Sequence, residues 1–103
     1  SREAVQLLKT KGVDFSIVEY QKKIITEDEI LEISTKLGLR PKDFVRKLER
    51  DFKENNLIEY LQDDLRMTQA MIKYPKIIER PIFIVGEKAV IARPPEKIFE
   101  ILE

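Results

Sequence analysis

Hydrophobic residues recur at helical spacing at the start of the chain and again further along it. The first pattern predicts a helix over 2–11, with Ser1 as its N-cap. The second predicts a helix that begins after Thr26, because Thr26 and Glu29 have the spacing of a capping box, and that ends at Gly38. Each helix has one apolar face, which we expect to pack against a core.

Two further helices are predicted in the middle of the chain. Pro41 suits the first turn of one of them. The residues of that helix predicted to face inward are Phe44, Val45 and Leu48. The other helix is predicted to start at Asp63 or Asp64 and to stop before Pro75.

Three segments have the composition of strands. Residues 13–20 are rich in β-branched and aromatic side chains. Residues 81–85 are continuously apolar, as expected for a strand covered on both faces. The Gly86–Glu87 turn predicts 88–92 as the antiparallel partner of this strand, and a last helix is predicted after Pro94. Helices thus precede, separate and follow strands, which indicates an α/β (α+β) fold class.

The predicted sheet has only three strands, which is thin for the apolar helices that need to cover it. A parallel β-α-β unit would supply a further strand ahead of Ser1 and would make the sheet mixed. We therefore expect 1–103 to be a single domain whose first strand is missing from this chain.

Composition narrows the chemistry. The 19 basic and 19 acidic residues cancel, so nothing in the net charge favours a nucleic acid or an anionic membrane as partner. With no His and no Cys, these residues cannot form a Ser–His or Cys–His nucleophile, a zinc site that needs His or thiolate ligands, or a disulfide. No apolar stretch approaches the ~20 residues that span a bilayer, so a cytoplasmic location is the default.

Three acidic residues occur close together in the sequence, Glu59, Asp63 and Asp64. Its spacing fits no calcium loop, and Asp at a helix start is explained by capping. We therefore expect no metal site.

Three arginines stand out by position. Arg80 directly precedes Pro81 at the start of the most apolar strand, and Arg93 directly precedes Pro94 after the hairpin. Arg46 adjoins residues predicted to face inward. Guanidinium is a permanently charged fork that matches oxyanions, so three converging arginines would form an oxyanion site. Spacing alone leaves open whether they converge or are separate surface charges.

Three short motifs in the sequence are together specific enough to suggest a protein family. They are Pro41-x-x-x-Val45-Arg46-Lys47, Tyr74-Pro75 through Ile78-Glu79-Arg80-Pro81-Ile82, and Ala92-Arg93-Pro94-Pro95-Glu96. Together they resemble the glutaredoxin-dependent arsenate reductase family, and the similarity covers essentially the whole chain. The resemblance implies a thioredoxin-like fold with a helical insertion over about 41–74. It also implies a first strand and a Cys-x-x-Ser loop upstream, with Ser1 as the last residue of that motif.

The resemblance implies a thiol-dependent oxidoreductase that converts arsenate to arsenite. The family's thiolate attacks arsenate to form a covalent adduct, glutathione acts as co-substrate, and glutaredoxin completes the reduction. No bound cofactor is implied. The implied oxyanion ligands are Ser1, Arg46, Arg80 and Arg93, the three arginines are also catalytic, and Pro81 is the active-site cis-proline. Without the cysteine we expect this chain to be inactive, and we expect a monomer with no nucleic-acid or membrane partner.

Other classes of function stay open. The same fold serves non-enzymatic, redox-sensing transcription regulators, and a related glutathione-linked thiol enzyme or a plain interaction domain would also fit. The residues upstream of Ser1 separate these classes. Cys-x-x-Ser supports the reductase, Cys-x-x-Cys the regulator, and no cysteine the interaction domain.

Overall fold

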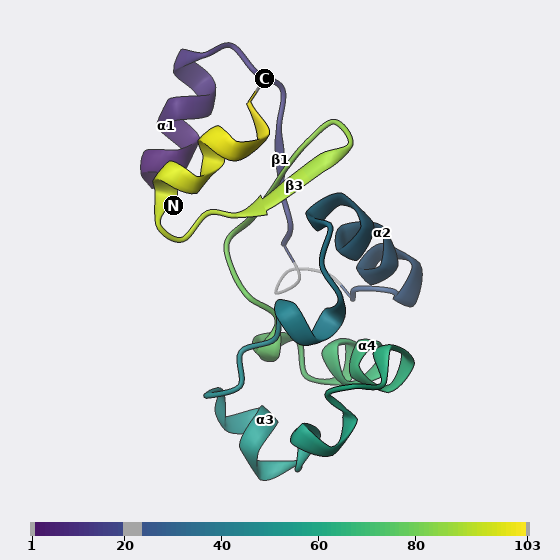
Figure 1. The fold of residues 1–103 in the computed structure, drawn as a ribbon. Coiled ribbons are helices and arrows are strands. Elements are labelled where there is room, and N and C mark those ends of the chain that lie inside the picture. The colour runs from purple at the N-terminus through teal and green to yellow at the C-terminus, as the bar shows by residue number, and fades with distance from the viewer. Residues whose placement is uncertain (1, 20–23, 103) are drawn as a thin grey trace. The chain divides into compact units, whose positions relative to one another are not determined.

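The computed structural model describes residues 2–19 and 24–102. The chain divides into two units, the first formed by Ser1–Val18 with Arg80–Glu103 and the second by Glu19–Glu79. The first unit holds the sheet, and the second is built of helices and short 3₁₀ turns (Figure 1). Helices and strands therefore combine as predicted for an α/β chain.

The sheet of the first unit has the strand order β1-β2-β3, and both pairings are antiparallel. Its strands are β1 (Ser16–Ile17), β2 (Ile82–Val85) and β3 (Lys88–Ile91). The predicted hairpin is confirmed, and the central strand β2 buries Ile82 and Phe83 completely. The first strand is much shorter than the predicted 13–20. The N–H of Val13 bonds to Leu8 O at the end of the preceding helix, so Val13 is not part of the strand, whereas the N–H of Val18 still donates to Ile82 O. Tyr20 lies outside the described residues.

Two helical segments of the first unit lie side by side, α1 (Arg2–Thr10) and the 3₁₀ segment η4 (Pro95–Ile101) (Figure 1). The prediction of the first helix is confirmed, whereas its N-cap Ser1 lies outside the described residues. The last helix is 3₁₀ and leaves the side chain of Phe99 48% exposed. The buried core of this unit consists of Ala4, Leu8, Phe83, Val90, Ala92, Ile98 and Ile101.

Helix α2 (Glu27–Leu37) opens the second unit with the predicted capping box. Thr26 Oγ1 accepts a hydrogen bond from the N–H of Glu29 at 3.2 Å, and the N–H of Thr26 donates to Glu29 Oε1 at 2.9 Å. Gly38 ends the helix with a φ of 70°, the left-handed conformation that glycine adopts without strain. Local sequence signals therefore determine both ends of this helix.

Helix α4 (Asp64–Lys73) is central to the second unit. It contacts α2 and the 3₁₀ turns η1 (Pro41–Asp43), η2 (Leu57–Tyr60) and η3 (Pro75–Ile77). Asp63 caps α4 by accepting a hydrogen bond from the N–H of Arg66 at 3.0 Å, which confirms the predicted helix start. In 2–19 and 24–102, no acidic cluster could hold a metal ion. No helix there is long and apolar enough to cross a membrane.

The prediction that Pro41 opens an α-helix is wrong. Pro41 begins only the 3₁₀ turn η1, and a separate short helix, α3, covers Arg50–Glu54. Phe44 and Val45 are buried as predicted, but Leu48 is 84% exposed. The physical reason is that backbone groups of Phe44 and Arg46, which a helix would use for its own hydrogen bonds, are bonded to residues further along the chain. The bonds concerned run from the N–H of Arg46 to Ile77 O at 2.6 Å and from the N–H of Glu79 to Phe44 O at 3.0 Å.

Side-chain hydrogen bonds keep the turn η1 closed. The N–H of Arg40 donates to Asp43 Oδ2 at 3.2 Å, and Lys42 Nζ donates to Asp43 Oδ1 at 3.3 Å. The pKa of the Asp43 carboxyl is lowered, because desolvation, which raises it, is outweighed by these bonds and by the charges of Lys42 and Arg40. Asp43 therefore holds the turn as a carboxylate.

Candidate functional site

Arg80 and Arg93 directly flank the last bonded pair at the open end of the β2–β3 hairpin. Ile82 pairs with Ile91 in the antiparallel ladder. The N–H of Ala92 then donates to Pro81 O at 2.9 Å, which continues the ladder by one residue on each side. Paired segments lie about 5 Å apart, so the long side chains that follow this last bond can reach one small ligand.

Both of these arginines are exposed. Each precedes a cis peptide bond, Arg80–Pro81 and Arg93–Pro94. The first has the geometry that the family resemblance implies, and the role of Pro81 in an active site stays a prediction. The second has no counterpart among the sequence predictions, although the same Arg-Pro pair occurs at both positions.

Arg46 is anchored within the second unit. Its Nη1 donates to Lys76 O at 3.3 Å and lies 3.4 Å from Glu49 Oε2. The Arg46 side chain is only 25% exposed, so both contacts are partly shielded from water. Both use Nη1, and within the described residues they leave the other nitrogens of the fork available for an anion. Sequence reasoning missed Glu49, because an acidic residue three positions from an arginine is common on protein surfaces.

The structure places the predicted ligands in different parts of the chain. Arg80 and Arg93 belong to the first unit, and Arg46 belongs to the second. Within the second unit, Val45 and Ile78 form an isolated antiparallel bridge. Val45 directly precedes Arg46, and Ile78 comes two residues before Arg80 in the sequence. Convergence of all three arginines on one ligand stays a prediction, and Ser1 lies outside the described residues.

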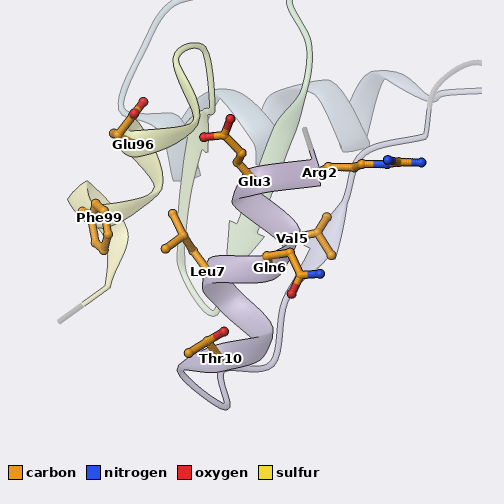
Figure 2. A pocket seen from close by; sticks show the side chains of 8 residues that line it. All are labelled: Arg2, Glu3, Val5, Gln6, Leu7, Thr10, Glu96 and Phe99. Atoms are coloured by element: carbon orange, nitrogen blue, oxygen red, sulfur yellow. The ribbon is translucent and has the colours of Figure 1, made fainter.

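A groove between α1 and η4 offers a different surface in the first unit. It has a volume of 770 Å³. Its lining residues are Arg2, Glu3, Val5, Gln6, Leu7, Thr10, Glu96 and Phe99. Figure 2 shows Leu7 pointing toward Phe99, whereas Arg2 points to the other side of α1. Glu3 and Glu96 both line this groove, and their negative charges make it a poor oxyanion site. The hairpin end is therefore the better candidate in this unit.

Comparison with known proteins identifies the family of the chain. A family model described as the ArsC family matches residues 1–101. An arsenate reductase of Haemophilus influenzae is 38% identical, over 99% of this chain and 89% of that protein. The uncharacterized protein YfgD of Escherichia coli is 35% identical, over 99% of this chain and 87% of that protein.

A solved structure agrees with these sequence matches. The arsenate reductase from Vibrio cholerae superposes with a TM-score of 0.86 at 34% identity, over 99% of this chain and 87% of that chain. The thioredoxin-like fold predicted from the sequence is thus confirmed. A match over nearly every residue, in sequence and in structure, establishes the family: the chain belongs to the ArsC family.

Proposed function

We propose that this chain carries the oxyanion-binding part of a thiol-dependent arsenate reductase. In this proposal Arg46, Arg80 and Arg93 are the catalytic arginines that hold arsenate, together with Ser1. The observation that supports the proposal is the bonded pair Pro81 and Ala92 at the end of the hairpin, which Arg80 and Arg93 directly flank. Membership of the ArsC family and the relatives named arsenate reductases support arsenate as the substrate.

The chemistry of arsenate explains why arginines are needed. Arsenate is a tetrahedral oxyanion, and a guanidinium can bind two of its oxygens at once. Arginines on two facing segments approach such an anion from different sides. Their positive charge also lowers the repulsion that a thiolate meets when it attacks an anion. The same side chains therefore bind the substrate and favour the attack.

The thiol in this proposal comes from the Cys-x-x-Ser loop that the family resemblance places before Ser1, since 1–103 contain no cysteine. A cysteine there would lie near the start of α1, where the helix dipole and the backbone N–H groups lower a thiol pKa. Its attack on arsenic releases water and forms a covalent thiol–arsenate adduct. Glutathione supplies the second thiol as co-substrate, arsenic takes up two electrons, and the two thiols become a disulfide. Glutaredoxin then reduces this disulfide, and no bound cofactor takes part.

The test has two steps. The first is to read the gene ahead of the Ser1 codon, where a cysteine three residues before Ser1 would complete Cys-x-x-Ser and support the proposal. The absence of a cysteine at that position would contradict the proposal. The second is an assay of arsenate-dependent NADPH oxidation coupled through glutathione and glutaredoxin. We expect no turnover by the 103-residue chain and turnover by the chain that carries its cysteine loop.

We further propose that the protein acts as a monomer in the cytoplasm, with glutaredoxin as its protein partner. The equal numbers of acidic and basic residues support the absence of a nucleic-acid or membrane partner. Light scattering of the purified chain tests the oligomeric state. A mass twice that of the chain would contradict the monomer.

A further inference from the structure

A pocket in the second unit has the lining of a site for a small organic anion. Its volume is 450 Å³, within the range of about 300–1,000 Å³ that is usual for small-molecule sites. Its lining residues are Asn55, Leu57, Tyr60, Arg66, Gln69, Ala70, Lys73 and Tyr74. Two of these eight residues are cationic and none is acidic. We propose that this pocket binds a carboxylate or phosphate ester that carries a flat apolar body.

One face of α4 presents both cations. Arg66, Gln69, Ala70 and Lys73 follow one another at spacings of three, one and three residues, which sets them on the same side of a helix. Thr68 and Met71 lie on the opposite side of α4 and are 1% and 0% exposed, so that side packs into the core. The helix therefore holds the two charges at a fixed separation on one outward face.

Aromatic rings keep these cations at the pocket. The Arg66 guanidinium carbon lies 5.2 Å from the centroid of the Tyr60 ring, and Lys73 Nζ lies 5.5 Å from that of Tyr74. At these distances a cation is attracted by the face of the ring. Each charged group thus has a preferred position before any ligand arrives, which reduces the entropy lost on binding.

The wall next to Lys73 is fixed by hydrogen bonds. Tyr74 Oη donates to Asn55 Oδ1 at 3.1 Å, and Asn55 Nδ2 donates to Asp51 O at 2.8 Å. Leu57 lines the pocket and is held in place by burial, since it is 3% exposed, and the rings of Tyr60 and Tyr74 add apolar lining. A flat apolar group can pack there while its anionic group points to the positive charges.

The nearest carboxylate competes weakly. Asp63 Oδ2 lies 3.8 Å from Arg66 Nε, and the two side chains are 52% and 61% exposed. Exposed pairs at this distance contribute little, so an incoming anion can replace the contact. The pocket is also separate from the proposed arsenate ligands, because Arg46, Arg80 and Arg93 are absent from its lining.

The experiment titrates the ¹⁵N-labelled chain with phenyl phosphate, inorganic phosphate and phenol, and follows the backbone amides by NMR. We expect phenyl phosphate to shift the amide resonances of residues 55–60 and 66–74. We also expect it to bind more tightly than inorganic phosphate or phenol alone. Arg66→Gln and Lys73→Gln should each lower the affinity for phenyl phosphate about tenfold, which is the usual effect of removing a charged hydrogen bond. Lys53→Gln, an exposed lysine outside the pocket, is the matched control and should leave the affinity unchanged.

Three results would overturn the proposal. One is equal affinity in all three variants. Another is a phenyl phosphate affinity no greater than that of inorganic phosphate. The third is a set of shifts confined to residues around Arg46, Arg80 and Arg93, which would assign the anion to the proposed arsenate site instead. Because both tested side chains are exposed, unchanged thermal unfolding of the variants will show that they fold.

Discussion

The backbone N–H of Ala92 donates to the carbonyl oxygen of Pro81 at 2.9 Å, and Arg80 and Arg93 directly flank this bonded pair. The two arginines are therefore positioned by the backbone of the hairpin. Arg46 is held by its backbone N–H, which donates to Ile77 O, and also through its side chain by Glu49 and by the carbonyl of Lys76. The side-chain anchors of Arg46 can be removed by substitution, whereas its backbone bond stays.

Glu49→Gln removes the charge that faces Arg46 and keeps the size of the side chain. We expect the free energy of unfolding to fall by about 1 kcal/mol, near the upper end for ion pairs that water reaches, because both side chains are mostly shielded. Urea denaturation measures this. The control is Glu54→Gln, which breaks the more exposed pair with Arg50 and should lose only about 0.3–0.5 kcal/mol. Equal losses in the two variants would show that Arg46 is no better anchored than a surface residue.

Thr26→Ala removes the capping box of α2. The N–H of Glu29 loses its acceptor, and we expect the free energy of unfolding to fall by about 1 kcal/mol in urea denaturation. Thr35 lies within the same helix, where its hydroxyl donates to Leu31 O. Thr35→Ala should be neutral or slightly stabilising, because alanine is the better helix former. A larger loss from Thr35→Ala than from Thr26→Ala would contradict the capping role.

Thr68→Val should stabilise the chain. Thr68 is 1% exposed, and its Oγ1 has no hydrogen-bond partner within 2–19 and 24–102. A buried hydroxyl without a partner is unfavourable, so replacing it with a methyl group of similar size should raise the free energy of unfolding by about 1 kcal/mol. Thermal or urea unfolding measures the change, with the exposed Thr35→Val as control. A fall in stability would show that the Thr68 hydroxyl is satisfied.

Features set by neighbours along the chain were predictable from the sequence. The capping box needs only Thr26 and Glu29, three residues apart, and Gly38 ends the helix by its own conformation. The β2–β3 hairpin was predictable for the same reason, since its turn and both strands are continuous in sequence. The hairpin also explains why Arg80 and Arg93 flank its open end.

Features set by distant residues were not predictable. The residues after Pro41 have a helical pattern, but Arg46 bonds to Ile77, and this tertiary pairing overrides the local preference. The contact between Asn55 and Tyr74 joins side chains 19 residues apart and leaves no periodic trace in the sequence. The pocket beside α4 therefore became visible only in the structure.

The most direct test of the central claim is the affinity of the 103-residue chain for arsenate, measured by NMR titration at low ionic strength. We expect saturable shifts at residues near Arg80 and Arg93. In the Arg80→Gln/Arg93→Gln double variant, we expect at least about a tenfold loss of affinity, since each charged contact contributes about 1.5–3 kcal/mol. Lys97→Gln, a nearby exposed lysine, should bind arsenate like the unaltered chain. Equal arsenate affinity in the double variant and the unaltered chain would contradict the account.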